Sequence, residues 1–495
     1  MCRFRIRYAI GEAPSGLMQD QSNPQSLEVL GFTEPEQPET RLLQPPPVPR
    51  TLQDTGLHSQ FLLNFTLKFL YISALQTVPE ISNQIKLSQR IVESLLETLK
   101  EQRLVQVTGA ADNNPLILKY VLTDKGKERA IEALKQSEYI GPVPVPLAAY
   151  QAQGEKQAIA NEQIRADQLS RTLSHLVLSE KVLRQLGPGM NSGRAILLYG
   201  SGGNGKSCIA EALGRTFQQT IYIPYCIEVD RQMIRIFDPA LHEEESPESD
   251  SESSEENTIY GRSVKFDPRW VRCRRPLVVT GGELTLKMLD LDFDSVSKYY
   301  EAPLQVKATG GVFIIDDFGR QQIHPRDLMN RWILPLEKRV DYLTLHTGKK
   351  FEIPFDAVVI FSTNISPEAL MDAPSLRRIP YKLQIDPPSE EDYETIFRRV
   401  CKSYDIEFSK DLVSYLMDDF YNKKNIPLAG FHPKFIVDHV MAACKFEGVP
   451  PCLSHHLVKE ALQNLVVSEP TEAAPGPDPL RNPVLKEAEP VGLGS

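Results

Sequence analysis

Residues 195–207 read Ala-Ile-Leu-Leu-Tyr-Gly-Ser-Gly-Gly-Asn-Gly-Lys-Ser, an apolar run that leads directly into a glycine-rich loop. The loop fits the pattern G-x-x-x-x-G-K-[ST], and the amphipathic stretch after it predicts a helix. Glycines let backbone N–H groups surround a phosphate, and the helix directs the positive end of its dipole toward that anion. The stretch therefore predicts a strand, a phosphate-binding loop and a helix.

The loop residues form the predicted nucleotide site. Lys206 supplies a positive charge for the β- and γ-phosphates of ATP, and the Ser207 hydroxyl is a ligand for Mg²⁺. Cys208 follows the motif, and we expect its side chain to pack within the helix. The residues expected to contact ATP are Gly200, Ser201, Gly202, Gly203, Asn204, Gly205, Lys206, Ser207 and Cys208.

Two further apolar runs end in polar side chains suited to phosphate chemistry. The run Val312-Phe313-Ile314-Ile315 predicts a buried strand that delivers Asp316 and Asp317 at its end. We expect Asp316 to hold Mg²⁺ and Asp317 to polarise the attacking water. Residues 358–363 predict another strand, and Asn364 follows it, where an amide would orient that water.

Length, charge and cysteine content limit the class of protein. A chain of 495 residues is too long for one compact core and predicts two or three domains, at roughly 150 residues each. The net charge is −10, but eight of the acidic residues lie in 243–256, so the rest of the chain is close to neutral. This balance argues against a general nucleic-acid or acidic-membrane binder.

The expected location is the cytoplasm. The seven cysteines form no C-x-x-C pair, which favours a reducing compartment. No run of about 18 apolar residues occurs and the N-terminus lacks an apolar signal core, so we expect no direct membrane insertion.

Residues 51–140 predict a small α+β domain. The expected elements are helices that begin near Leu57, Val78 and Ser88, strands at 104–108 and 116–123, and a helix from Thr123 to Leu134. Ser88 is expected to cap the third helix. Three helices followed by a β-hairpin are typical of a winged helix-turn-helix domain.

The charges of this domain bear on its partner. The third helix carries Arg90 and Lys100 against Glu93, Glu97 and Glu101, and residues 45–140 hold eleven basic and ten acidic side chains. DNA binding usually needs a clear basic surface. Docking of a protein, or regulation within the chain, is therefore favoured, and DNA binding stays an open alternative.

The three motifs together resemble an AAA+ ATPase over residues 176–467. The resemblance rests on the phosphate loop, on Ile314-Ile315-Asp316-Asp317, on Phe361-Ser362-Thr363-Asn364, and on Ser375-Leu376-Arg377-Arg378-Ile379-Pro380 with a helical C-terminal segment. Residues 334–345 and 348–354 are similar to a helix and hairpin of MoxR-like and chelatase-like members. With a winged helix in front, the chain resembles AAA family ATPases of bacterial type.

The resemblance implies an α/β P-loop domain with a five-stranded parallel sheet, a C-terminal helical lid, and a hexamer-like homo-oligomeric ring that binds ATP and Mg²⁺ between neighbours. It places Arg377 and Arg378 at the arginine-finger position, and which of them acts is open. Lys434 stands at the second sensor, where arginine is usual. Asp317 stands where most relatives have glutamate, and its shorter side chain is compatible with slow hydrolysis.

Composition and resemblance together give the expected domain boundaries. They are a disordered region with a Pro-rich linker at 1–50, the winged-helix-like domain at 51–140, a helical connector at 141–187 closed by Gly187-Pro188-Gly189, the nucleotide-binding domain at 188–386 with a disordered acidic insertion at 242–257, a helical lid at 387–467, and a disordered tail at 468–495.

The expected function is that of a Mg²⁺-dependent ATPase that remodels or regulates a protein client. Two alternatives remain: an ATP-regulated protein that binds DNA in transcription, and a nucleotide switch with slow turnover.

Overall fold

The computed structural model describes residues 44–111, 114–245, 258–259, 262–263 and 266–465. The disorder predicted for 1–50, 242–257 and 468–495 falls mostly on residues outside these ranges. Residues 44–50 are described, and there Pro46 is buried and its carbonyl accepts from Asp267 N at 3.0 Å. Within the described residues, no helix combines the length and the apolar character that a bilayer crossing requires.

The first folded segment contains three helices, a hairpin and a fourth helix. They are α1 (Ser59–Ile72), α2 (Val78–Ile85), α3 (Gln89–Glu101), β1 (Val105–Ala111), β2 (Asn114–Leu122) and α4 (Asp124–Gln136). The Thr77 and Glu80 side chains form a capping box at α2, and the Thr123 hydroxyl caps α4 by accepting from Gly126 N. These local bonds explain why the starts of α2 and α4 match the sequence pattern.

Two expectations for this segment differ from the structure. Ser88 occupies the N-cap position of α3, but its hydroxyl makes no capping bond and is buried without a hydrogen-bond partner among the described residues. The hairpin is also longer than expected, because Gly109 and Ala110 pair with Lys119 and Leu118 in the antiparallel ladder and do not form a turn.

The predicted connector is three short helices and not one long one. They are α5 (Leu147–Lys156), α6 (Ala166–Thr172) and α7 (Glu180–Asn191). Gly187-Pro188-Gly189 does not close the connector, because it lies inside α7. A Cβ on Gly189 would lie 3.1 Å from Ile196 Cδ1, so glycine permits α7 to pack closely against the next strand.

The main sheet has five parallel strands, as the resemblance implies. In spatial order they are β11 (Leu277–Thr280), β14 (Gly311–Ile315), β17 (Ala357–Thr363), β4 (Ile196–Tyr199) and β18 (Tyr381–Gln384). Strands β14 and β17 are buried at every position, which accounts for their continuous apolar sequences.

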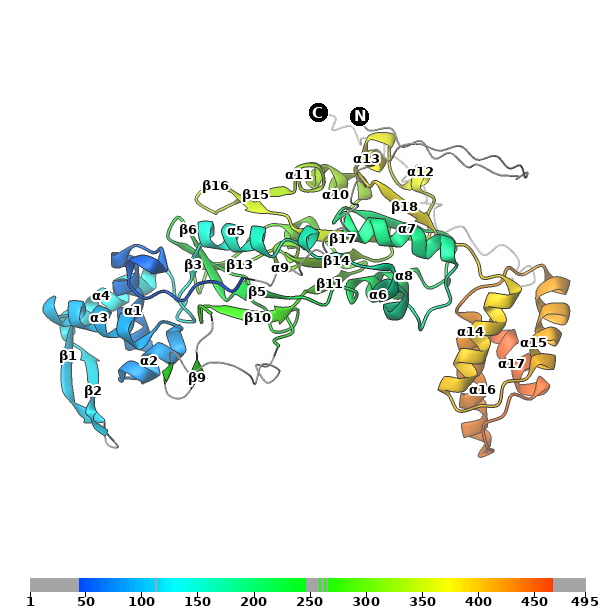
Figure 1. Cartoon of the computed structure of the whole chain (residues 1–495), viewed down its shortest axis with the longest axis horizontal. Helices are drawn as coiled ribbons and strands as arrows, with labels where there is room; N and C mark the ends of the chain where they lie inside the picture. Colours follow the sequence, from blue (N-terminus) through cyan, green and yellow to red (C-terminus); the bar gives the residue numbers. More distant parts are fainter. Residues whose placement is uncertain (1–43, 112–113, 246–257, 260–261, 264–265, 466–495) are drawn as a thin grey trace, which may run out of the picture. The chain divides into compact units, whose positions relative to one another are not determined.

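Helices cover both faces of this sheet (Figure 1). On one face, Leu198 and Ile314 belong to the same buried cluster as residues of α6, α7 and α8 (Lys206–Gly214). On the other face, Leu197 and Phe313 pack with Trp332, which follows α10 (Pro325–Arg331). The alternation of side chains along each strand thus gives a three-layer α/β/α unit.

A second sheet was not anticipated from the sequence. Its order is β12 (Asp292–Asp294), β13 (Tyr299–Glu301), β7 (Gln232–Arg235), β6 (Cys226–Val229) and β3 (Val145–Pro146). Beside it, β5 (Thr220–Pro224) pairs antiparallel with β10 (Trp270–Arg274). The start of the predicted acidic insertion is also ordered: His242 is buried, and Glu245 pairs with Arg272 at 3.0 Å.

Short elements connect the strands of the main sheet. They are β8 (Thr258–Ile259), β9 (Arg262–Ser263), α9 (Leu304–Lys307), α11 (Ile333–Lys338), β15 (Val340–Thr344), β16 (Lys350–Pro354), α12 (Pro367–Leu370) and α13 (Ala373–Arg378). The pair β15 and β16 is the hairpin expected before the strand that ends at Asn364.

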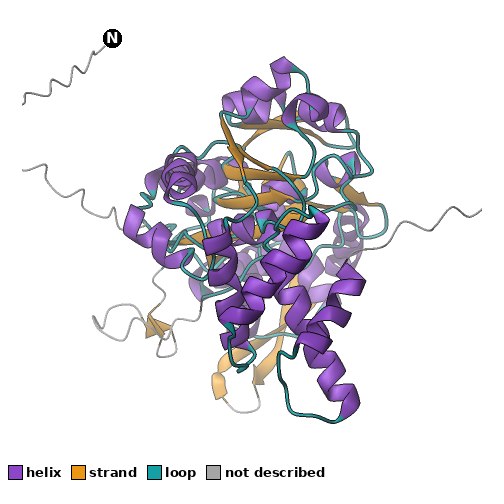
Figure 2. Cartoon of the chain, turned by 90° about the vertical axis from the view of Figure 1, so that its right-hand side faces the viewer, coloured by secondary structure: helices purple, strands orange, loops and turns teal. Residues whose placement is uncertain are grey.

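The C-terminal described segment is helical throughout (Figure 2). It consists of α14 (Glu390–Ser403), α15 (Lys410–Tyr415), a π-helical stretch (Leu416–Asn422), α16 (His432–Glu447) and α17 (His455–Leu465). Tyr393, Phe397, Leu416 and Val440 are buried together in its core. This segment has its own hydrophobic cluster, distinct from the two that flank the sheet.

Candidate functional site

The predicted site residues follow the carboxyl ends of three neighbouring strands. Strand β17 pairs in parallel with β14 on one side and with β4 on the other. In the register, Ile315 lies opposite Phe361, and Thr363 lies opposite Tyr199. The chain therefore leaves these strands along one edge of the sheet, where ligands of open α/β sheets bind.

The glycine loop adopts a conformation that other residues rarely take. Gly200, Gly203 and Gly205 have φ values of 139°, 76° and 79°. A Cβ on Gly200 would lie 2.3 Å from the Ile385 carbonyl oxygen, so a side chain does not fit there. Gly205 is also the N-cap of α8, which places the positive end of the helix at the loop.

Lys206 is held across the loop. Its Nζ donates hydrogen bonds to the carbonyl oxygens of Gly200 at 3.0 Å and Ser201 at 2.8 Å. Burial lowers the pKa of Lys206, and the nearby carboxylates of Asp317 and Asp316 oppose this shift. The ammonium group thus lies near both acidic residues, which follow β14, although the lysine itself comes from the loop after β4.

Ser207 and Asp316 meet directly. The Ser207 hydroxyl donates to Asp316 Oδ1 at 2.9 Å. Asp316 N donates to the Thr280 carbonyl at 2.8 Å, and Gln321 Nε2 donates to the Asp316 carbonyl at 2.7 Å, so the backbone that carries the carboxylate is fixed on both sides. A hydroxyl beside a carboxylate is an oxygen pair suited to Mg²⁺.

Asp317 and Asn364 lie at the exposed side of the same edge. Asp317 is exposed and has φ of 49°, a left-handed conformation that Asp tolerates better than most residues. Asn364 is exposed as well, and its Nδ2 lies 3.9 Å from the position that a Cβ on Gly202 would occupy. Both polar groups are therefore available beside the phosphate loop.

The two arginines of α13 have different surroundings. Arg378 Nε donates to Glu337 Oε1 at 2.7 Å, and its Nη1 donates to the Pro374 carbonyl at 3.1 Å. Arg377 is exposed and makes no hydrogen bond or ion pair with any residue that the structure describes. Of these two arginines, Arg377 is the one whose guanidinium group is free for another molecule.

The helical segment contacts the loop through backbone N–H groups and through the Phe431 ring, since a Cβ on Gly203 would lie 2.2 Å from Phe431 Cδ1. Gly430 N donates to Asn204 Oδ1 at 3.1 Å, and Phe431 N donates to the Gly203 carbonyl at 2.9 Å. The Lys434 ammonium is directed elsewhere, since it pairs with Asp438 at 2.7 Å. The resemblance places Lys434 at the second sensor, whereas the residues of this segment that contact the loop are Gly430 and Phe431.

Cys208 does not pack as expected. It is exposed, because the buried positions of α8 include Ile209, Ala210 and Leu213. Ser201 and Asn204 complete the loop, where Asn204 Nδ2 donates to Ser201 Oγ at 2.7 Å.

The site offers few metal ligands of its own. In the described part of the chain, no three His, Cys, Asp or Glu side chains are grouped to hold a metal ion. A magnesium ion beside Ser207 and Asp316 would depend on phosphate oxygens and water for its remaining ligands, which is common for Mg²⁺. The oxygen donors present fit that ion.

Comparisons with known proteins give limited similarity. Residues 389–464 match a family model described as a domain of unknown function (DUF8689), and no curated protein matches the chain. The crystal structure of NtrX from Brucella abortus is similar at 14% identity over 70% of this chain and 68% of its own, with a TM-score of 0.36. The RuvB Holliday junction branch migration motor of Thermotoga maritima is similar at 14% identity over 61% and 70%, with a TM-score of 0.30.

Domain III of the Thermotoga maritima replication initiation protein DnaA is similar at 12% identity, over 60% of this chain and 96% of its own, with a TM-score of 0.33. Similarity this weak does not bear on function. The chemistry of the site follows from its residues.

Proposed function

We propose that this chain is a Mg²⁺-dependent ATPase of the AAA+ class. The observation that carries the proposal is the 2.9 Å hydrogen bond between Ser207 and Asp316, formed beside Lys206 at the edge of a parallel sheet. Glycines with positive φ precede the lysine, and a helix N-terminus follows it. This combination binds a polyphosphate and a divalent cation together.

Each residue has a distinct task in the proposed reaction. Lys206 and the loop N–H groups bind the phosphates, while Ser207 and Asp316 hold Mg²⁺, which would neutralise charge on the β- and γ-phosphates. Asp317 accepts a hydrogen bond from the attacking water and takes its proton, and Asn364 orients that water.

We further propose that the active site is completed by a second copy of the chain in a ring. The free guanidinium of Arg377 supports this, because an exposed arginine without a partner in the described residues can reach nucleotide bound to a neighbour. Arg378 is less suited, since Glu337 holds it at 2.7 Å.

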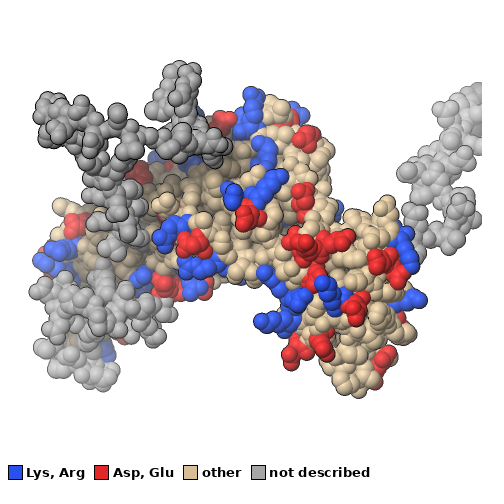
Figure 3. Space-filling model, turned by 45° about the vertical axis from the view of Figure 1, so that its right-hand side comes forward, with Lys and Arg blue, Asp and Glu red and all other residues tan. Residues whose placement is uncertain are grey.

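A protein client is the favoured partner, and the segment 51–140, which we take as a winged-helix domain, would recruit it. Figure 3 brings the C-terminal helical segment forward, and on that face basic and acidic side chains are interspersed. In α3, Arg90 and Lys100 are accompanied by exposed Glu93 and Glu97. DNA binding has no comparable support from charge.

The test is ATP hydrolysis as a function of protein concentration. We expect specific activity to rise with concentration, and Lys206→Ala and Arg377→Ala to reduce it at least about 100-fold, as for loss of a transition-state charge. A mixture of the two variants should recover part of the activity, because one kind of shared site then contains both functional residues. Arg194→Ala, which removes an exposed arginine before β4, is the matched control and should retain full activity.

Two results would overturn parts of this proposal. Hydrolysis that survives Lys206→Ala would exclude the phosphate loop as the active site. Activity that is independent of concentration, with no recovery in the mixture, would exclude a site shared between subunits. ATP binding without turnover at any concentration would instead support a slow nucleotide switch.

A further inference from the structure

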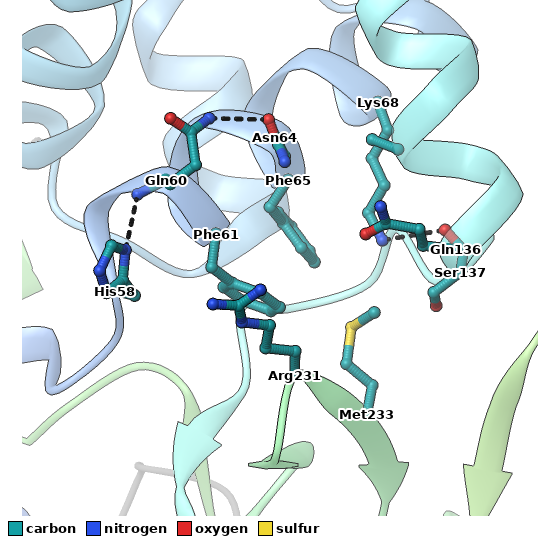
Figure 4. Close-up of a pocket in the computed structure, with 11 residues that line it drawn as sticks. His58, Gln60, Phe61, Asn64, Phe65, Lys68, Gln136, Ser137, Arg231 and Met233 are labelled. Carbon is teal, nitrogen blue, oxygen red and sulfur yellow. Dashed lines mark hydrogen bonds between the residues drawn. The ribbon is translucent and has the colours of Figure 1, made fainter. Parts of the chain in front are cut away.

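A cavity separate from the phosphate loop lies between α1, α4 and the turn that joins β6 to β7 (Figure 4). Its volume is about 260 Å³. Phe61, Phe65 and Met233 supply apolar walls, and the amides of Gln60, Asn64 and Gln136 supply polar ones. This volume is slightly below the usual range of ligand pockets, which indicates a small ligand.

Lys68 of α1 lines this cavity and is unusual in its burial. The residue is 4% exposed. Its Nζ donates to the Ser137 carbonyl at 3.1 Å and lies 4.9 Å from the centre of the Phe65 ring. Among the residues that the structure describes, Lys68 forms no ion pair with a carboxylate. One carbonyl leaves two of the three ammonium donors of Lys68 without an acceptor in that part of the chain.

An unpaired buried ammonium is costly to a fold. Burial lowers the pKa of Lys68 to about 7, which reflects the penalty for charging this group. A methionine or leucine would fill the same volume without that penalty. A lysine kept in a cavity under these conditions indicates a role in binding an anion.

Arg231 adds a second cation at the cavity. It lies in the turn between β6 and β7, is exposed, and has φ of 62°. Its side chain lines the cavity together with that of Phe61 (Figure 4). In the described residues the side chain of Arg231 has no ion-pair partner, while its backbone N donates to Glu228. The cavity thus combines two basic side chains, neither of which has a carboxylate partner within the described chain, with aromatic walls.

We propose that this cavity binds a small organic carboxylate with an aromatic or apolar body. Lys68 and Arg231 bind the carboxylate, and Phe61, Phe65 and Met233 enclose the body of the ligand. The site is independent of the ATPase proposal, because it shares no residue with the phosphate loop. Since α1 and the β6–β7 turn both contribute, the ligand would connect the N-terminal helices to the second sheet.

The experiment is isothermal calorimetry on the full chain with sodium benzoate. Benzamide has nearly the same shape without the charge, and inorganic phosphate has the charge without the ring. We expect benzoate to bind at least about tenfold more tightly than either, as a charge-assisted hydrogen bond predicts. Lys68→Met should weaken benzoate binding at least about tenfold. Lys127→Met, at an exposed position of α4, is the matched control and should leave it unchanged.

The outcomes that overturn the proposal are distinct. Absence of benzoate binding up to about 10 mM would refute it, as would equal affinity for benzoate and benzamide. If the Lys68→Met protein binds benzoate as tightly as the wild type, Lys68 does not bind the carboxylate. Arg231→Gln provides a second variant at an exposed position where folding is not at risk, and it should weaken benzoate binding severalfold. A melting temperature at or above that of the wild type would confirm that Lys68→Met folds.

Discussion

The neighbouring arginines of α13 differ in what their side chains touch. Arg378 is tied to Glu337 and to the Pro374 carbonyl, whereas Arg377 is exposed and unpaired within the described residues. An arginine that serves another subunit has to be free within its own. The structure therefore separates two residues that sequence resemblance treats alike.

We predict opposite effects for substitutions at these two positions. Arg377→Ala should abolish hydrolysis without changing the melting temperature. Arg378→Ala should lower stability by about 1 kcal/mol through loss of the pair with Glu337, and should retain most of the activity. Parallel measurements of steady-state ATP hydrolysis and thermal unfolding test this pair. An inactive Arg378→Ala protein beside an active Arg377→Ala protein would reverse the assignment.

Some contacts of single residues in the candidate site could be predicted from the sequence and others could not. The contact of Ser207 with Asp316 could be predicted because each residue follows a strongly apolar strand, and parallel strands end at one edge. The contact of Phe431 with Gly203 could not, because it joins a backbone N–H and a ring of the helical segment to a loop far earlier in the chain. The exposure of Cys208 could not be predicted either, because it depends on which face of α8 is buried. Neighbouring residues of a helix point to different sides, so a shift of one position changes the answer.

Helix α16 begins at a buried histidine. The Tyr421 hydroxyl lies 3.0 Å from His432 Nδ1 and 2.7 Å from the Tyr393 hydroxyl, so three parts of the helical segment share one polar network. Burial lowers the pKa of His432 to about 4. The residue directly before it, Phe431, donates to the phosphate loop, so this network fixes the start of α16.

We predict that the helical segment loses stability in weak acid. The unfolded histidine has a pKa of about 6.5, so the unfolded chain binds more protons than the folded one between about pH 6.5 and pH 4. The stabilisation is therefore complete above about pH 6.5 and is lost as the pH falls toward 4, by about 3 kcal/mol. Urea unfolding between about pH 7 and pH 4.5, followed by hydrogen exchange in α16, measures this loss.

His432→Phe provides the comparison, because phenylalanine fills the site and does not titrate. Its stability should depend less on pH than that of the wild type. His456→Gln, in α17 with an exposed side chain, should leave the pH dependence unaltered. An identical pH dependence for His432→Phe and the wild type would show that other groups cause the acid sensitivity.

The two sheets differ in how far their strands could be predicted from the sequence. The strands β14 and β17 were predictable because their residues are buried at every position, which leaves a continuous apolar run in each. The second sheet was not, because β3, β12 and β13 have two or three residues each, and β3 and β13 pair with β6 and β7, which lie far away in the chain. Short strands carry too little periodicity to distinguish them from loops.

A buried ion pair connects distant parts of the whole molecule. Arg269 and Asp267 form it at 2.8 Å, and both side chains are almost completely buried. Arg269 Nη1 also donates to the carbonyls of Thr55 at 3.1 Å and Pro144 at 3.2 Å. These carbonyls flank the segment of α1 to α4, so one guanidinium group holds both ends of that segment to the start of β10.

We predict that Arg269→Met uncouples this segment in thermal unfolding. Removal of one partner leaves the Asp267 charge and two carbonyls buried and unpaired, at a cost of about 3 to 5 kcal/mol. Differential scanning calorimetry should then show an additional transition at lower temperature. Arg274→Met, which removes only an exposed pair with Glu243, should unfold like the wild type. A single unshifted transition in the Arg269→Met protein would contradict the prediction.

The strand order of the main sheet also has a consequence for the synthesis of this chain on the ribosome. Strand β4 carries the phosphate loop, yet its two neighbours are β17 and β18, which are made much later. A nascent chain that already contains the complete loop has no neighbouring strand for β4 until Thr363, the last residue of β17, has left the exit tunnel. During this interval β4 is an apolar segment without a partner, so chaperone binding to nascent chains should be strongest at intermediate lengths and should decline once β17 is available.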